Sequence, residues 1–210
     1  MKTSVYRTLP VLAGAALALS AQANLVVNGD FEAGDAGFSS DYTNGDIYDP
    51  AIYLVGTNPG AVHNQWASFG DHTTGSGQMM IINGSEDMND KVWFQTGITV
   101  EANTEYFFST WLASSHMANV AELTFMINGD VVGSPILAPT TLGDWVQFYA
   151  VWNSGAATTV DLAIRNAQDA FGGNDFALDD IVFSTTPVPE PATMIVLALG
   201  AAYMRRRRRR

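Results

Sequence analysis

Carboxylate oxygens are the most abundant chemically active groups in this sequence. Residues 24–187 contain 20 of the 21 acidic residues of the chain but only two basic ones, Lys91 and Arg165. The formal charge of this stretch is therefore −18, whereas the whole chain carries −11. Such a charge favours solubility and divalent cations. It excludes nucleic acid as a partner, because phosphate binding requires clustered Lys and Arg.

Asp179 stands out because it lies in the apolar sequence Leu178-Asp179-Asp180-Ile181. A carboxylate buried in such a strand needs a cation or several hydrogen-bond donors, since leaving it unpaired is costly. Because basic side chains are almost absent, calcium, which prefers six to eight oxygen ligands, is the favoured partner. The alternative is that Asp179 or Asp180 only accepts backbone hydrogen bonds at a strand end.

The sequence lacks the common catalytic patterns. It has no cysteine, no G-x-S-x-G motif and no phosphate-binding loop, and its three histidines form no zinc-binding pair. The densest acidic cluster, Glu86, Asp87 and Asp90, lies among turn residues, which indicates a solvated loop rather than the facing carboxylates of a glycosidase. We therefore predict that the protein is not an enzyme. A small polysaccharide-active enzyme is the alternative.

Aromatic residues provide the second possible chemistry, because their rings stack on the apolar faces of sugars. All five tryptophans lie in predicted strands and are expected mainly in the core. Three tyrosines lie in a polar stretch with fewer packing obligations. The predicted glycan-binding residues are Tyr42, Tyr48, Tyr53 and Trp66.

The elements that must position these residues are short strands. Alternating segments separated by Gly, Asn, Asp and Pro run through residues 24–187, and no helical period of useful length occurs there. The predicted strands are Leu25–Asn28, Val62–Phe69, Gln78–Asn83, Lys91–Val100, Thr104–Ala113, Ala121–Asn128, Asp144–Trp152, Thr158–Arg165 and Asp175–Phe183. They predict an all-β fold, an antiparallel β-sandwich of jelly-roll type.

Turn residues define several connections. Asn128-Gly129-Asp130 predicts a hairpin, and Glu101-Ala102-Asn103 predicts another tight link. Residues 34–60, rich in Gly, Asp, Asn, Tyr and Pro, are expected to form a long functional or covering loop.

Both ends of the chain read as export signals. Two basic residues, an apolar run and Ala21-Gln22-Ala23 predict a signal helix at 1–23 that is removed after Ala23. At the other end, Pro189-Glu190-Pro191 precedes 13 mostly apolar residues and six terminal arginines. The run is short for a membrane span, and the arginines would stay on the cytoplasmic side. We predict a sandwich domain at 24–184, a linker with the Pro-Glu-Pro motif at 185–191 and a transmembrane-like sorting helix at 192–210.

This C-terminal arrangement resembles the PEP-CTERM sorting signal of Gram-negative bacteria. The resemblance covers about 23 residues and has all three parts in order: Pro189-Glu190-Pro191, the apolar helix and the arginines. It implies a transient stay in the inner membrane, processing by an exosortase, and a final location at the cell surface or outside the cell. It reports a destination and leaves the activity open.

The body of the chain resembles the galactose-binding-like jelly rolls related to carbohydrate-binding module families 4 and 9. The resemblance rests on the opening sequence Asn24–Gly34, the closing sequence Asn174–Phe183 and the loop Asp71–Gly75. It implies a structural calcium between the first and last strands. By position, the implied calcium ligands are Glu32, Asp71, Thr74 and Asp179.

These observations lead to one expected function. We expect an exported, non-catalytic, calcium-stabilised surface or matrix protein that binds extracellular polysaccharide. A purely structural surface protein without a ligand is a further alternative.

Overall fold

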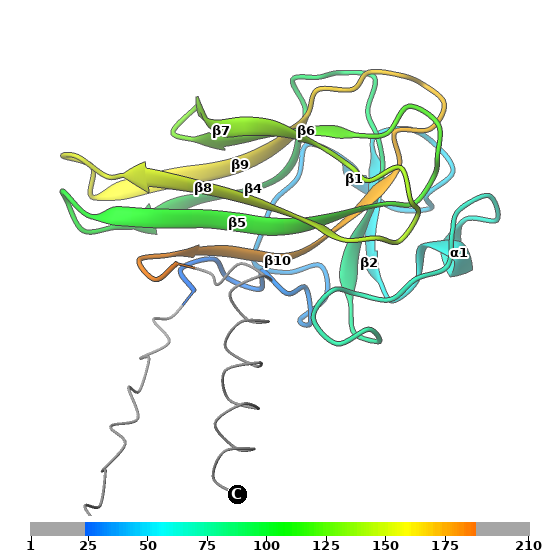
Figure 1. Cartoon of the computed structure of the whole chain (residues 1–210), viewed down its shortest axis with the longest axis horizontal. Helices are drawn as coiled ribbons and strands as arrows, with labels where there is room; N and C mark the ends of the chain where they lie inside the picture. The colour runs from blue at the N-terminus through cyan, green and yellow to red at the C-terminus, as the bar shows by residue number, and fades with distance from the viewer. Residues whose placement is uncertain (1–23, 188–210) are drawn as a thin grey trace, which may run out of the picture.

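A computed structural model describes residues 24–187 (Figure 1). The predicted signal peptide, the Pro-Glu-Pro motif and the C-terminal helix lie outside these described residues. Within them, no helix is both long enough and apolar enough to span a membrane.

The described chain forms two packed β-sheets (Figure 1). One sheet has six strands in the order β1 (Thr43–Asn44), β2 (Ile52–Gly56), β3 (Met79–Asn83), β10 (Phe176–Ser184), β5 (Glu105–Ser114) and β8 (Val146–Asn153). The other has four strands in the order β4 (Lys91–Thr99), β9 (Thr159–Asn166), β6 (Glu122–Ile127) and β7 (Asp130–Leu137). Every pairing between these strands is antiparallel except β1 with β2. The predicted all-β jelly-roll sandwich is confirmed.

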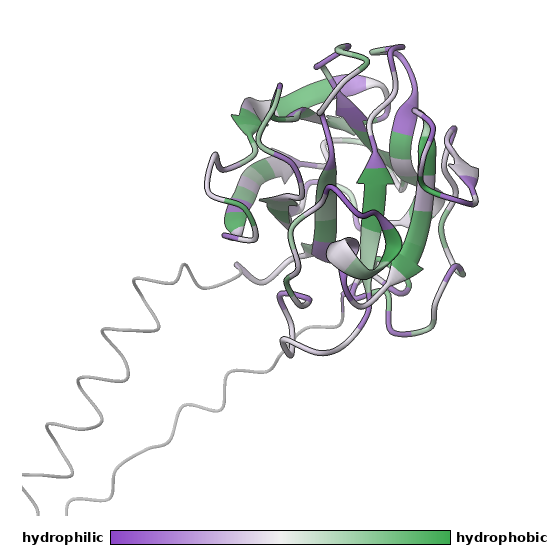
Figure 2. Ribbon diagram, turned by 90° about the vertical axis from the view of Figure 1, so that its right-hand side faces the viewer, coloured by the Kyte–Doolittle hydropathy of each residue, from purple (hydrophilic) through white to green (hydrophobic). Residues whose placement is uncertain are grey.

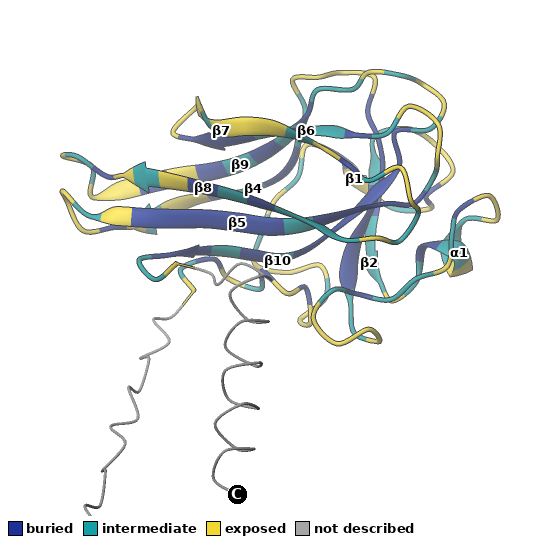
Figure 3. Ribbon diagram, in the orientation of Figure 1, coloured by how far each residue is buried: buried dark blue, intermediate teal, exposed yellow. Residues whose placement is uncertain are grey.

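The core lies between the sheets because inward-facing residues alternate along each strand. In β5, Tyr106, Phe108 and Leu112 are buried in the main cluster, where the ring of Phe108 meets that of Phe125 in β6 edge to face at 5.6 Å. Figure 3 shows β5 and β10 buried along most of their length, while β7 is largely exposed. In Figure 2 the hydrophobic colour is concentrated on the strands.

A second apolar cluster covers part of the outer face of the six-stranded sheet. It contains Met79, Ile81 and Ala177 from the sheet, together with Ile47 and Trp66 from segments that pack over them. The covering segment includes the short helix α1 (Pro59–Val62), which Asn58 caps by accepting the N–H of Gly60. Because this face is covered, the strands beneath it are apolar on both sides.

Two of the predicted strands are wrong. Leu25–Asn28 forms turns, because Asn28 and Phe31 adopt positive φ angles of 54° and 56°. Val62–Phe69 belongs to the covering segment, because Pro59 and the Asn58 cap start a helical turn just before it.

The prediction of a continuous loop at 34–60 is also wrong. The strand β2 lies within it and pairs with β3 along its whole length, from Ile52↔Asn83 to Gly56↔Met79. The predicted hairpin at Asn128-Gly129-Asp130 is confirmed, with φ angles of 54° and 87° at Asn128 and Gly129. The link at 101–103 joins β4 to β5 and therefore passes from one sheet to the other.

The two ends of the described chain are tied together. The Leu25 N–H donates to the Phe183 carbonyl over 2.9 Å, and the Asn24 side chain accepts the Phe183 N–H and donates to the Ile181 carbonyl. Both sheets and the core are complete between these ends, so residues 24–187 contain a full folding unit.

Candidate functional site

The loop between Asp71 and Gln78 gathers carboxylates around its backbone. Asp71 is almost fully buried and accepts N–H groups from Thr74 at 2.7 Å and Gly77 at 2.6 Å, and the Thr74 hydroxyl also donates to it. Burial opposes ionisation of Asp71, but these hydrogen bonds prevail and lower its pKa. Asp71 is therefore held as a carboxylate.

Glu32 reaches the same loop from the N-terminal turn. Its Oε1 accepts the Gln78 N–H at 2.8 Å. A Cβ added at Gly77 would collide with this Oε1 and lie 3.1 Å from Asp71 Oδ2. The carboxylates of Glu32 and Asp71 therefore both lie close beside Gly77, where only a glycine fits, and they could form part of an oxygen-lined cation site.

Asp179 contacts the start of the loop from β10 and is fully buried. Its Oδ2 accepts the N–H groups of His72 and Thr73 at 2.9 and 3.1 Å, and its Oδ1 accepts the Asp180 N–H. Burial, with the nearby charge of Asp180, raises the pKa of Asp179 to about 7. Asp180, at a bulge with a φ of 49°, contacts the imidazole of His72 at 2.7 Å instead.

The four residues implied as calcium ligands are thus brought to one loop, although they come from three distant segments. Glu32 and Asp71 lie beside Gly77, with the Thr74 hydroxyl next to Asp71, while Asp179 faces backbone N–H donors. Among residues 24–187, no group of three or more His, Asp and Glu side chains is arranged to hold a metal ion by itself. Backbone carbonyls or water would have to supply the remaining ligands of a calcium ion.

The residues predicted to stack on sugars are mostly inside the protein. Tyr42 and Tyr53 are buried, and their hydroxyls pair with the Ser85 N–H and the Asp35 carboxylate. Trp66 is buried and donates from Nε1 to Asp175 Oδ2 at 3.0 Å. Of the four, Tyr48 alone has a largely accessible ring, with 55% of the residue exposed.

Tyr48 is the outer member of an aromatic stack above a buried carboxyl group. Its ring lies 4.6 Å from that of His63, which stacks on Trp66 at 4.6 Å. Burial, with the nearby His116, lowers the pKa of His63. Beneath the stack, burial raises the pKa of Asp175 to about 7, and its Oδ1 has no hydrogen-bond partner among the described residues.

The outer face of the four-stranded sheet is a partly exposed surface that sequence reasoning missed. Trp93, Ile164 and Phe125 point from this sheet into the core, so their neighbours along the strands point outward. Strand register places the outward residues in two rows: Lys91, Arg165 and Thr124, and Phe94, Ala163, Met126 and Val131. We call these seven residues the sheet face.

The sheet face holds both basic residues of the described chain as a cross-strand pair. Lys91 on β4 lies directly opposite Arg165 on β9. The Lys91 Nζ is 3.4 Å from Asp41 and 4.6 Å from the centre of the Phe94 ring. Two hydrogen bonds from Asn89 lower the pKa of Asp87, and the positive charge of Arg165 lowers it further. The Nε–H of Arg165 has no hydrogen-bond partner within residues 24–187.

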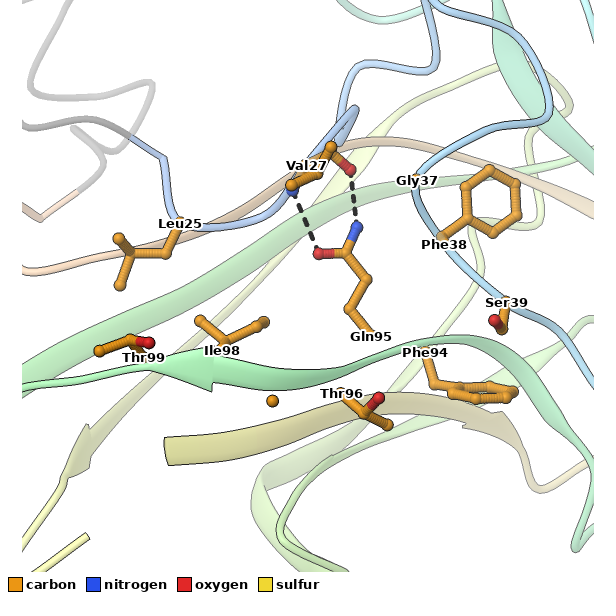
Figure 4. Close-up of a pocket in the computed structure, with 11 residues that line it drawn as sticks. Leu25, Val27, Gly37, Phe38, Ser39, Phe94, Gln95, Thr96, Ile98 and Thr99 are labelled. Atoms are coloured by element: carbon orange, nitrogen blue, oxygen red, sulfur yellow. Dashed lines mark hydrogen bonds between the residues drawn. The ribbon is translucent and has the colours of Figure 1, made fainter. Parts of the chain in front are cut away.

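A hollow of about 510 Å³ continues from the sheet face along the outer edge of β4, beyond its bridge with Ser39 at Phe94 (Figure 4). Phe38 and Phe94 lie on opposite walls at one end of it, and Leu25 and Ile98 lie toward the other. The Gln95 side chain spans the hollow and exchanges two hydrogen bonds with the Val27 backbone, at 2.6 and 3.1 Å. The hollow thus has apolar walls, aromatic rings and polar edges. These are features of small-molecule sites.

Several solved carbohydrate-binding domains share the fold of the described chain. The CBM22-1 xylan-binding domain from Paenibacillus barcinonensis Xyn10C superimposes with a TM-score of 0.52 and 13% identity, over 80% of this chain and 97% of that domain. TmCBM61, solved in complex with β-1,4-galactotriose, superimposes with a TM-score of 0.51 and 13% identity. The match covers 78% of this chain and 99% of TmCBM61. The tandem CBM22-1-CBM22-2 chain of Xyn10C superimposes with a TM-score of 0.51 and 14% identity. The match spans 81% of this chain and about half (49%) of the tandem chain. The domain therefore has the galactose-binding-like jelly-roll fold of carbohydrate-binding modules.

The end of the chain has a match of its own. Residues 187–210 match the PEP-CTERM protein-sorting motif, which confirms the sorting signal predicted from the sequence. The motif indicates an exported protein. No curated protein matches the chain significantly.

Proposed function

We propose that this protein is an exported, non-catalytic polysaccharide-binding protein whose sheet face and adjoining hollow form the glycan site. The observation that carries the proposal is the pairing of Lys91 with Arg165 beside the ring of Phe94 on a partly exposed sheet face. Lys and Arg donate hydrogen bonds to sugar hydroxyls, while an aromatic ring packs on the apolar face of a sugar. The Thr124 hydroxyl adds a further polar group in the same row.

The fold supports this proposal without specifying the ligand. The similar domains include a xylan-binding domain and one solved in complex with β-1,4-galactotriose. A hollow of about 510 Å³ lies in the size range of ligand sites in proteins. We infer that the ligand is an extracellular polysaccharide.

Replacing Phe94 with alanine should lower glycan binding by at least ten-fold without lowering the melting temperature strongly. The physical reason is the loss of the stacking surface of a partly exposed side chain. About 1.4 kcal/mol corresponds to ten-fold in affinity. Binding of residues 24–187 is first screened on a glycan array and then measured for the retained polysaccharides by affinity electrophoresis. Arg165→Ala should weaken the same binding.

Val151→Ala serves as the matched control, because Val151 is 50% exposed but lies on β8 in the other sheet. Loss of glycan binding in Tyr48→Ala but not in Phe94→Ala would show that the glycan site is the aromatic stack at Tyr48 rather than the sheet face. A domain that retains no glycan at all would contradict the proposal. Incubation with each retained polysaccharide should release no new reducing ends, and their release would support the enzymatic alternative.

We also propose a structural calcium at the loop 71–78. Glu32 and Asp71 would be its carboxylate ligands, with Thr74 and Asp179 supplying further protein oxygens. The close approach of both the Glu32 and the Asp71 carboxylate to Gly77 supports this proposal. When bound, calcium would neutralise repulsion between carboxylates and link the N-terminal turn to β10.

Calcium should therefore raise the melting temperature of the domain. At 100 times the dissociation constant, mass action stabilises the folded state by about 2.7 kcal/mol, or roughly 5–10 °C for a domain of this size. Calorimetry with calcium and with chelator measures the shift. Glu32→Gln should abolish it, whereas Glu105→Gln, an exposed acid at the start of β5, should leave it unchanged. An equal melting temperature with and without calcium would contradict the site.

The sorting motif supports a route that ends at the cell surface or in the extracellular matrix of a Gram-negative bacterium. We propose that an exosortase processes the chain while residues 192–210 hold it in the inner membrane. A polysaccharide-binding domain delivered by this route would attach to exopolysaccharide outside the cell.

A further inference from the structure

A second groove lies between the loops at the ends of β3 and β9, beyond the sheet face. Its volume is about 620 Å³, and it is lined by the loop 85–89, by Pro50 and Ala51, and by Phe171. Two apolar side chains are exposed there: Phe171, at 71%, and Met88, at 49%. We call this hollow the loop groove. Large exposed apolar side chains in a hollow indicate a binding site more often than isolated ones do.

The walls of the loop groove are braced by hydrogen bonds. On one side, Asp87 Oδ1 accepts two N–H groups from Asn89, at 2.8 and 2.9 Å, and the Ser85 hydroxyl donates to Asp90 at 2.7 Å. On the other, the fully buried Asn174 side chain donates to the Gln168 carbonyl at 2.8 Å.

The backbone beside Phe171 is also fixed. Asn119 donates to the Gly172 carbonyl at 2.7 Å, and Gly173 packs so closely on the Ala118 carbonyl that a Cβ there would collide with it. Phe171 is therefore presented at the surface by a loop that neighbouring segments support, which lowers the entropic cost of binding.

The chemistry of the loop groove fits a sugar better than a protein partner. One exposed ring is surrounded by two carboxylates and an amide, from Glu86, Asp87 and Asn89. These groups accept hydrogen bonds from vicinal hydroxyls, while the ring packs on C–H groups. A stable protein interface needs about 800 Å² from each partner, more than a groove of this size provides. Two carboxylates also disfavour an acidic ligand.

We propose that the loop groove is a second glycan site, which takes one or two uncharged sugar units on Phe171 with Asp87 and Asn89 as hydroxyl acceptors. It is separate from the sheet face but adjoins it, since Asp87 lies within the electrostatic reach of Arg165. A protein with two such sites binds a polysaccharide at two points and gains avidity.

The test separates the two sites in residues 24–187. The probe is an array of neutral oligosaccharides of one to six units, followed by titration calorimetry with those retained. The Phe94→Ala variant should still bind at least one mono- or disaccharide, and adding Phe171→Ala should weaken that binding at least ten-fold. Met117→Ala is the matched control, because Met117 is 69% exposed on the loop next to Phe171 but does not line the groove.

Each result is decisive for the loop groove. If Phe94→Ala removes all binding, the second site is overturned while the sheet face stands. If Phe171→Ala behaves like Met117→Ala, the second site is likewise overturned. If the unmodified domain binds nothing on the array, both sites fail. Phe171→Ala is expected to keep the melting temperature of the unmodified domain, because the ring is largely exposed, so a loss of binding cannot be attributed to unfolding.

Discussion

Replacing Asp175 with asparagine is expected to stabilise the domain at pH 8 and to leave its stability nearly unchanged at pH 4. Burial raises the pKa of Asp175 to about 7, against an ordinary value of 3.8. Between these two values the unfolded chain releases a proton that the folded state retains, so the stability of the unmodified protein falls as pH rises. Asparagine keeps an acceptor for Trp66 and has no group that ionises as the pH rises.

The expected difference in unfolding free energy between Asp175→Asn and the unmodified protein grows from about zero at pH 4 to on the order of 4 kcal/mol at pH 8. Urea unfolding of both proteins across this range measures it. Taking the difference removes the contributions of Asp179, whose pKa is raised in the same direction, and of Asp71, whose pKa is lowered. A difference that does not change with pH would show that Asp175 is ionised in the folded state at its ordinary pKa.

Replacing Asp179 with alanine is expected to cost about 3 kcal/mol or more in unfolding free energy, even in the presence of a chelator. Asp179 is fully buried and accepts backbone N–H groups from His72, Thr73 and Asp180. These three partly buried donors would lose their acceptor together, and each costs roughly 1 kcal/mol, the lower end of the range for an unpaired donor. Denaturant unfolding in EDTA measures this structural contribution in the absence of calcium.

The adjacent carboxylate provides the control. Asp180 is partly exposed and contacts the His72 ring and the Thr73 hydroxyl, so Asp180→Ala should cost no more than about 1 kcal/mol. Equal losses in the two variants would contradict the distinction drawn from their burial. A loss in Asp179→Ala that occurs only when calcium is present would show that Asp179 acts as a metal ligand rather than as an acceptor for the loop.

Much of the fold was predictable because strand signals are local. The alternation in β5 and β6, and the Asn128-Gly129 turn, depend on neighbouring residues and were recognised in the sequence. Residues 24–28 and 62–69 were wrongly predicted as strands, because apolar composition alone does not reveal a positive φ at Asn28 or a helix cap at Asn58. The strand β2 was missed within a stretch rich in turn-forming residues, where pairing with β3 prevails over local preference.

The candidate sites depended more strongly on the tertiary structure. Tyr42 and Tyr53 lie in a stretch of polar residues, which favoured a surface position. In the structure their rings are buried and their hydroxyls form hydrogen bonds inside the protein. Lys91 and Arg165 gave no local signal of proximity, because cross-strand register is a property of chain segments far apart in sequence.

The sequence by itself determined the all-β class, the acidic charge of the body and the sorting motif at 187–210, since each is written in composition or in a short contiguous pattern. Only the tertiary structure decided which side chains share a surface. It paired the two basic residues on the sheet face, placed Glu32 and Asp71 around Gly77, and exposed Phe171 beside the loop 85–89. The physical reason is that strand pairing and loop packing bring distant residues together, which no local pattern can specify.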